Sequence, residues 1–398
     1  MALVSAVAGC TGPKAVAVAP TSARANGGAF HVVAEGPCSR LSLQTIGDRT
    51  FVVYGDTGYD LHDWEVGEKL AAAQSIVEIR QGEAYRPTAM FGGLPLNSGG
   101  YVPADLRLGG TMEQSPWLVL VDTKYAPRGA GALFERESRG FVFEGSWRPH
   151  RGESPVDLPA EAAGLPALPD LCEGKPGVRF VKLAATTHPK GDVFVAGRCT
   201  QEGPIASRGA PIQVAHGAPG ARAWTISRTP ESHVLDGIVN VAMWTRRGDD
   251  AYLVAYEPFK SPDVRQPYLA RWNGKGWAQI ETGLPEGLMS VSGTEDGTLW
   301  IAAGRAVYRR PAGAAAFAKV EMPALRFASD PRPATLRLHT VRAVSADDVW
   351  VEGTYRVKVK KGEVETELRS GVLFRSRPGA THACDAREPA EKAFARVE

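Results

Sequence analysis

The sequence predicts an all-β fold, a β-propeller of four-stranded antiparallel blades, with six blades as the first choice and seven as the alternative. Three observations support this prediction: short apolar runs recur along the chain, glycine and proline separate them, and helical periodicity is rare. The chain of 398 residues is long enough for one large domain of this kind. Its 44 glycines and 29 prolines are spread between the apolar runs, which is typical of many short strands joined by turns.

The repeat rests on a series of short apolar runs that align with one another. They are RTFVVYGD (49–56), PWLVLVDT (116–123), GDVFVAGR (191–198), DAYLVAYE (250–257), GTLWIAAG (297–304) and DDVWVEGT (347–354). Each run has a partner strand upstream across a polar turn and further β-rich runs downstream, so each unit is predicted to be a four-stranded meander. A single such sheet cannot bury both of its faces, but a ring of sheets packed face to face can.

The two ends of the chain are predicted to meet in one blade. Residues 29–36 form an extra β-rich run before the first repeat, whereas the last unit has no clear fourth strand after residues 371–378. An open ring would expose strand edges that pair with other chains. We therefore expect the N-terminal strand to complete the last blade, which would bring Cys38 close to Cys384.

The domain organisation follows from this repeat. We expect a single propeller domain over residues 29–384 and a C-terminal tail over 385–398. The Pro/Ala/Glu-rich segment 148–174 is predicted to be an exposed insertion, and a division into two domains at that segment is the alternative. Helical periodicity is convincing only over residues 63–79, where we expect a helix or a helix followed by a strand.

The N-terminal segment, residues 1–10, is apolar and ends in VAGC. Residues 7–10 resemble the lipobox of bacterial lipoproteins, in which the cysteine becomes the lipidated first residue of the mature chain; no Lys or Arg precedes it, as a signal peptide would require. The resemblance implies lipidation at Cys10, and the alternative is an ordinary residue in a frayed terminus. Residues 11–28 are rich in small residues, Pro and Gly and are expected to form a flexible tether.

Four further cysteines remain, an even number that suits an exported protein with two disulfides. None has the C-x-x-C spacing of a zinc or redox site. We prefer Cys172–Cys199, which would bracket one repeat unit, and Cys38–Cys384, which would clamp the chain ends. The other two connectivities stay open, as do four free thiols in a reducing compartment.

The best-defined units also resemble a known repeat. Residues 288–311, LMSVSGTEDGTLWIAAGRAVYRRP, are similar to the bacterial propeller repeat of two-component-regulator sensor ectodomains. Residues 341–355, VRAVSADDVWVEGTY, resemble the variant found in exported bacterial repeat proteins. The resemblance implies a propeller and carries no information about a ligand.

The same stretch approximates the Asp-box of sialidases, with Thr294, Asp296, Gly297 and Trp300 in order. In those enzymes the box is structural. We therefore expect Asp296 and Gly297 to form a tight hairpin turn, in which glycine supplies a positive φ, and Trp300 to be part of the core. A sialidase would also need an arginine cluster and a tyrosine nucleophile, and no such pattern is recognisable.

No catalytic residue, metal ligand or cofactor site is predicted, because the chain carries none of the usual nucleophile, zinc or phosphate-binding motifs. The net charge of +2 gives no electrostatic basis for nucleic-acid binding, and the basic run 356–363 alternates like a charged edge strand. The acidic loop 54–65 is expected to be a solvated turn, with a Ca²⁺ site as the alternative. Trp272 and Trp277 are expected to flank a hairpin and pack on opposite faces or between blades, with a sugar platform as the alternative.

These observations favour a non-enzymatic protein of the cell envelope that acts as a binding or scaffolding module. The expected partner is a protein or a glycan, the expected state is a monomer, and the only expected membrane contact is a lipid anchor. The protein would then lie at the outer membrane, in the periplasm or outside the cell. The main alternative is a propeller glycosidase or lyase with carboxylates at the central channel; a sensor ectodomain is less favoured, because no membrane span or signalling domain follows the repeats.

Overall fold

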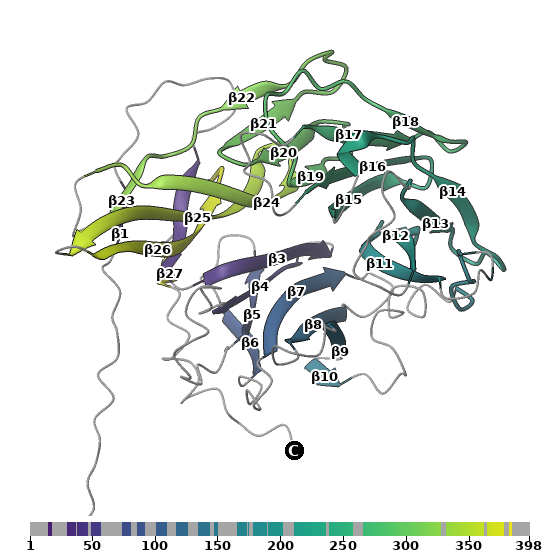
Figure 1. Ribbon diagram of the computed structural model, residues 1–398, viewed down its shortest axis with the longest axis horizontal. Helices are drawn as coiled ribbons and strands as arrows, with labels where there is room; N and C mark the ends of the chain where they lie inside the picture. Colours follow the sequence, from purple (N-terminus) through teal and green to yellow (C-terminus); the bar gives the residue numbers. More distant parts are fainter. Residues whose placement is uncertain are drawn as a thin grey trace, which may run out of the picture.

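Six antiparallel sheets carry almost all of the secondary structure in the part of the chain that the computed structural model describes (Figure 1). That part comprises the strands given below, residue 30 and most of residues 165–377. Side chains are described for residues 30–32 and, with gaps, for residues 165–377.

We number the sheets in chain order as blades 1 to 6. Blade 1 contains β3 (Cys38–Ile46), β4 (Arg49–Asp56), β5 (Gln74–Arg80) and β6 (Arg86–Phe91). Blade 2 contains β7 (Tyr101–Gly109), β8 (Trp117–Tyr125), β9 (Phe134–Phe143) and β10 (Trp147–Pro149). Blade 3 contains β11 (Val178–Thr187), β12 (Val193–Gln201), β13 (Gln213–Gly217) and β14 (Thr225–Arg228).

The second half of the chain continues the pattern. Blade 4 contains β15 (Asn240–Arg247), β16 (Asp250–Tyr256), β17 (Tyr268–Trp272) and β18 (Trp277–Gln279), preceded by the 3-10 turn η3 (His233–Leu235). Blade 5 contains β19 (Ser290–Gly293), β20 (Leu299–Ala303), β21 (Ala306–Arg310) and β22 (Ala318–Val320). Blade 6 contains β24 (Thr335–Ser345), β25 (Asp348–Lys361), β26 (Val364–Arg375), β2 (His31–Gly36) and β27 (His382–Ala383). A separate ribbon pairs β1 (Ala15–Ala17) with β23 (Leu325–Phe327).

The blades form a ring that the N-terminal strand closes. The first strand of blade 6, β24, contacts both β19 of blade 5 and β3 of blade 1, so the last blade lies beside the first. Strand β2 pairs antiparallel with β26, for example Val32 with Phe374, and therefore adds the start of the chain to the last blade (Figure 1). The predicted propeller class and its closure by an N-terminal strand are confirmed.

The helix expected over residues 63–79 is wrong where it can be compared. Residues 74–80 form β5, which pairs with β4 on one side and β6 on the other. The β-branched residues of this segment suit a strand that is hydrogen-bonded along both edges, and this tertiary pairing overrides the weak helical periodicity. Residues 63–73 lie outside the described residues.

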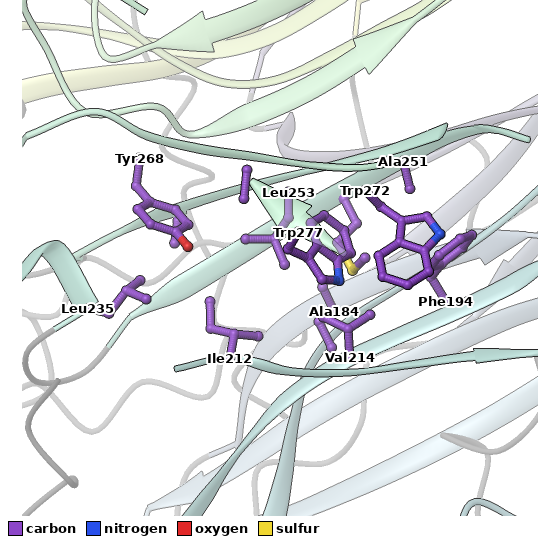
Figure 2. Close-up of a cluster of buried hydrophobic side chains, with 14 of the residues drawn as sticks. Ala184, Phe194, Ile212, Val214, Leu235, Ala251, Leu253, Tyr268, Trp272 and Trp277 are labelled. Atoms are coloured by element: carbon purple, nitrogen blue, oxygen red, sulfur yellow. The ribbon is translucent and has the colours of Figure 1, made fainter. Parts of the chain in front are cut away.

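Neighbouring blades bury apolar side chains against each other. Between blades 3 and 4 the core contains Phe194, Leu253 and Tyr268, together with Trp272 and Trp277 (Figure 2). Because side chains alternate along a strand, successive residues of each second strand pack against different neighbours. On β16, for example, the core shared with blade 3 receives Leu253 and the core shared with blade 5 receives Tyr252 and Val254.

Serine side chains of blade 5 bind the free inner edge of blade 6. The hydroxyl oxygen of Ser290 accepts a hydrogen bond from the backbone N–H of Val341 at 3.3 Å, and that of Ser292 accepts one from Ala343 at 3.0 Å. These N–H groups belong to β24, the first strand of its sheet. Hydrogen bonds from the adjacent blade thus satisfy edge donors that would otherwise be left to solvent.

The segment predicted as an exposed insertion, residues 148–174, lies against blade 3 over part of its length. Leu165 is buried and packs on Val193 and Val195 of β12, and Leu171 is also buried. Gly217 on β13 makes room for this contact, because a Cβ there would lie 2.3 Å from Leu165 Cδ1. The expectation of full exposure is therefore wrong for these two leucines, since they cover an apolar sheet face. Residues 150–164 lie outside the described residues.

Candidate functional site

One arrangement recurs where the second strand of a blade begins, in blades 3 to 6. A polar or acidic residue is followed two positions later by an aromatic residue, and a cation lies opposite the aromatic ring on the third strand. The sets are Asp192–Phe194–His216, Asp250–Tyr252–Arg271, Thr298–Trp300–Arg309 and Asp348–Trp350–Arg375. Directly opposed residues in antiparallel strands lie on the same face, so each cation is placed beside its ring.

The contacts within these sets tie the strands together. Asp348 accepts two hydrogen bonds from Arg375, both 2.7 Å long, and the Arg375 guanidinium lies 4.6 Å from the centre of the Trp350 ring. Asp250, which is almost fully buried, binds Arg271 at 2.8 Å and Arg246 at 2.6 Å. Ion pairs with this bidentate or bridging geometry join the second strand to its neighbours and leave both carboxylates neutralised.

Blade 3 uses a histidine instead of an arginine. Asp192 Oδ1 lies 2.9 Å from His216 Nε2, and the imidazole stacks on the Phe194 ring with 4.2 Å between ring centres. This constellation has the residue types of a catalytic pair. The matching position of the Asp–Arg pairs in blades 4 and 6 indicates that it is a structural unit of the repeat.

Blade 5 carries the acid two residues earlier, in the turn. Asp296 accepts hydrogen bonds from the backbone N–H of Thr298 at 2.9 Å, from the Thr298 hydroxyl at 3.1 Å and from the Thr294 hydroxyl. Gly297 has a φ of +92°, and Trp300 is 2% exposed. The predicted turn at Asp296–Gly297 and the predicted core position of Trp300 are confirmed, so the sialidase-like motif is structural in this chain.

The hydrogen bond from the Thr294 hydroxyl, with those from Thr298, lowers the pKa of the Asp296 carboxyl. A lowered folded-state pKa means that the carboxylate stabilises the fold above its unfolded pKa and loses this effect as the pH falls through the folded pKa. We expect Asp296→Ala to lower the free energy of unfolding by about 1 kcal/mol at pH 7. The difference from the unsubstituted protein should shrink below about pH 4, the ordinary range of an aspartate pKa.

Urea unfolding at several pH values measures this difference. Asp249→Ala is the matched control, because Asp249 lies in the corresponding turn of blade 4 and makes an exposed ion pair with Arg247. Such pairs contribute little to stability. A loss for Asp296→Ala that stays constant down to pH 3 would contradict the proposed role of the carboxylate.

The other buried carboxylates were examined as candidates for the predicted channel acids. Glu286 accepts hydrogen bonds from the Arg305 backbone N–H at 3.1 Å and from the Tyr308 hydroxyl at 3.4 Å. Burial and this carboxylate together raise the pKa of the Tyr308 hydroxyl. Glu352 is buried on β25, on the face opposite the one that Val351 turns to blade 5. Glu286 thus connects two loops of blade 5, whereas Glu352 points to the side of the sheet that blade 1 adjoins.

The tryptophan pair forms part of the core. Trp272 and Trp277 are directly opposed on β17 and β18, their ring centres are 5.9 Å apart, and they are 3% and 9% exposed. Their indole N–H groups donate to the Gly248 carbonyl at 3.0 Å and to the Ser227 hydroxyl at 3.1 Å. Packing between blades is confirmed. The sugar platform and the packing on opposite faces are wrong, because opposed residues share a face.

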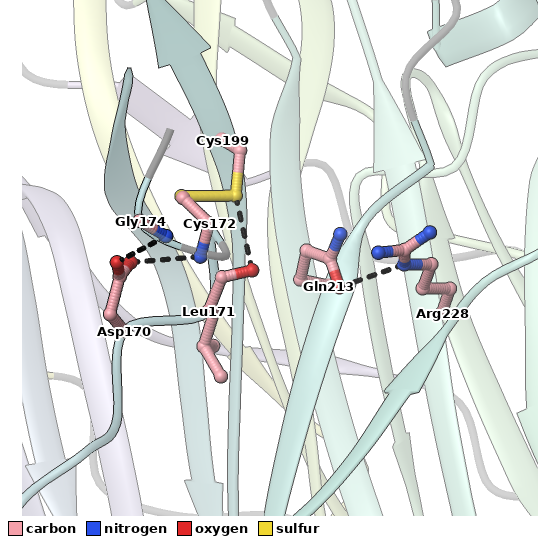
Figure 3. The surroundings of a disulfide bond; sticks show 7 residues. All are labelled: Asp170, Leu171, Cys172, Gly174, Cys199, Gln213 and Arg228. Atoms are coloured by element: carbon pink, nitrogen blue, oxygen red, sulfur yellow. Dashed lines mark hydrogen bonds between the residues drawn. A yellow bond between two sulfur atoms is a disulfide. The ribbon is translucent and has the colours of Figure 1, made fainter. Parts of the chain in front are cut away.

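A pocket lies beside the disulfide of blade 3 (Figure 3). It has a volume of about 510 Å³ and is lined by Pro169, Asp170, Leu171, Gln213, Ile226, Ser227 and Arg228. Asp170 accepts hydrogen bonds from the backbone N–H groups of Cys172 at 2.9 Å and Gly174 at 2.8 Å. Arg228 Nε donates to Gln213 Oε1 at 3.3 Å, and Ile226 is 43% exposed. The pocket therefore combines fixed polar groups with an exposed aliphatic surface.

Comparisons with known proteins show likeness only to solved structures. No known family pattern matches the chain, and no curated protein matches it in sequence. An α-L-arabinanase from Penicillium chrysogenum is similar with a TM-score of 0.46 and 10% identity, over 90% of this chain and 98% of that one. A Trypanosoma rangeli sialidase has a TM-score of 0.47 and 8% identity, over 91% of this chain and 58% of that one. A polysaccharide lyase that acts on ulvan has a TM-score of 0.40 and 11% identity, over 84% and 83%.

The names of these neighbours fit the alternative hypothesis of a glycosidase or lyase better than the main hypothesis of a non-enzymatic module, which they do not support. At TM-scores below 0.5, the likeness carries no argument about what this chain does.

The predicted site residues can now be placed. The Cys172–Cys199 disulfide is present, with 5.5 Å between the Cα atoms. The side chains of Cys10, Cys38 and Cys384, and those of the acidic loop 54–65, lie outside the described residues, so lipidation, the second disulfide and the Ca²⁺ alternative stay predictions. Among the residues with described positions, no group of three or more His, Cys, Asp or Glu side chains could hold a metal ion. No helix in the described part is long and apolar enough to cross a membrane.

Proposed function

We propose that the chain is an exported propeller of the cell envelope that binds a glycan and is anchored through a lipid on Cys10. The Cys172–Cys199 disulfide supports export, because such bonds persist in oxidising compartments. The pocket beside this disulfide carries the proposal of ligand binding, since a concave site with a few convergent polar groups is the usual form of a small-ligand site.

Binding without cleavage is the form of this function that we favour. Hydrolysis of a glycoside needs two carboxyl groups about 5–10 Å apart, free to act as acid and as base or nucleophile. Asp250, Asp348 and Glu286 instead hold strands and loops together through ion pairs and hydrogen bonds. These contacts neutralise or occupy the carboxylates, which makes them poor general acids.

A glycan panel tests the proposal and separates it from the glycosidase or lyase alternative. The purified protein is incubated with neutral and acidic oligosaccharides, and both binding and the release of new reducing ends or unsaturated products are measured. We expect saturable binding without product. Product formation that is lost in Glu352→Gln would establish the enzymatic alternative. The mass of the mature protein from envelope fractions tests the anchor: an unmodified Cys10 would contradict it.

A further inference from the structure

The pocket beside the disulfide has walls that are held in place before any ligand arrives. On one side, the disulfide joins Cys172 to β12, and the Asp170 carboxylate closes the turn through two backbone N–H groups. The same segment is tied to the sheet by a hydrogen bond of 2.9 Å from Trp224 Nε1 to the Pro166 carbonyl. On the other side, β13 and β14 are paired from Gln213–Arg228 to His216–Thr225. A site that is already ordered binds more tightly, because little conformational entropy is lost.

The charges of the pocket are balanced. Arg228 supplies one positive charge and Asp170 one negative charge, and the other five lining residues are neutral. An anionic or cationic ligand would pair with one of these groups and would meet the opposite effect at the other. A neutral ligand with several hydroxyl groups gains from both, because hydroxyls donate to the carboxylate and accept from the guanidinium.

The polar groups of the pocket are planar and remain able to bind hydroxyls. Each Asp170 oxygen accepts one backbone hydrogen bond and has a further lone pair, and the Gln213 amide retains its NH₂ donors. Ser227 is different, because its hydroxyl accepts from Trp277 and donates to the Val214 carbonyl. We expect Ser227 to contribute little to binding.

The apolar part of the pocket suits the C–H face of a sugar ring. Pro169 and Ile226 lie among the lining residues, and Ile226 is the large apolar side chain that the described surface exposes most. A volume of about 510 Å³ lies within the range of small-molecule sites. A polyol with one aliphatic face matches this combination of planar polar groups and aliphatic surface.

From this geometry we infer that the pocket formed by the 169–171 segment, β13 and β14 binds a neutral saccharide unit. This inference rests on the proposed glycan-binding function and names its ligand class and its place. The Arg228 and Asp170 side chains bind hydroxyl groups, and Ile226 and Pro169 contact the ring.

Titration of neutral oligosaccharides and of uronate-containing oligosaccharides tests this assignment. Arg228→Ala and Ile226→Ser are compared with Thr225→Ala, which changes an exposed residue of the same strand that does not line the pocket. Thermal melting checks that each variant folds. We expect neutral oligosaccharides to bind the unsubstituted protein, with affinity about tenfold weaker in Arg228→Ala and in Ile226→Ser, and unchanged in Thr225→Ala. A tenfold change corresponds to loss of one charge-assisted contact or of one small apolar contact.

The other outcomes separate the two proposals. If neutral saccharides bind equally well to all variants, the pocket assignment is overturned and glycan binding stands. If uronates bind more tightly and Arg228→Ala abolishes that preference, the neutral ligand class is overturned and the place stands. If no saccharide binds to the folded protein, the proposed function itself is wrong.

Discussion

Trp300→Ala is expected to lower the free energy of unfolding by about 3–5 kcal/mol, the usual effect of truncating a buried tryptophan. Trp300 is 2% exposed in the core between blades 5 and 6. Its ring meets Phe30 edge-on at 6.2 Å, and Arg309 lies 5.3 Å from the ring centre. Truncation would leave a cavity between two sheets whose backbones are held by their own hydrogen bonds and by the closure of the ring, so collapse to fill it would be limited.

Trp300→Phe is the matched control for this prediction. The Trp300 indole N–H has no hydrogen-bond partner within the described structure, so phenylalanine removes volume without breaking a hydrogen bond. We expect it to cost clearly less than alanine, as measured by urea unfolding. If Trp300→Ala left stability unchanged but abolished glycan binding or cleavage, the motif would be a functional site and the structural interpretation would fail.

Removal of the blade 3 disulfide is the second prediction with a large expected effect. Cys172 and Cys199 are 27 residues apart, and closing a loop of that length stabilises by about 3.5 kcal/mol in the chain-entropy model. The double variant Cys172→Ser/Cys199→Ser should therefore unfold at lower urea concentration. It should also bind pocket ligands more weakly, because the segment that forms one wall is no longer attached to β12.

Reduction of the unsubstituted protein provides the comparison. A reductant should destabilise the unsubstituted protein by about as much as the double substitution does. If the reductant destabilises the double variant as well, the second predicted disulfide, Cys38–Cys384, is present. If neither treatment changes stability, the disulfide does not contribute to the fold.

The sequence was informative where the structure is local. Asp296–Gly297 was predicted to form a turn because glycine tolerates a positive φ and aspartate binds nearby backbone N–H groups, and both depend only on adjacent residues. The β-rich runs and their spacing predicted the blades for the same reason. The Cys172–Cys199 pairing was predicted from its position around one repeat unit.

The errors occurred where partners from elsewhere in the chain decide the outcome. Residues 74–79 have some helical periodicity, yet two flanking strands make them β5. Leu165 belongs to a segment with the composition of an exposed loop, yet an uncovered sheet face buries it. The pocket was not predicted, because its lining comes from residues 169–171 and from two strands that the fold and the disulfide bring together.

The amino-acid sequence by itself determined the propeller class, because alternation of apolar residues, turn residues and repeat spacing are properties of short segments. Only the tertiary structure decided which polar groups are available to a ligand. Asp348 looks like a candidate acid in the sequence, but the strand pairing places Arg375 beside it and makes it part of the fold. Asp170 looks like a loop residue, but the disulfide and the turn hold it at the wall of a pocket. The reason is that engagement of a charge depends on neighbours in space, which the sequence order does not specify.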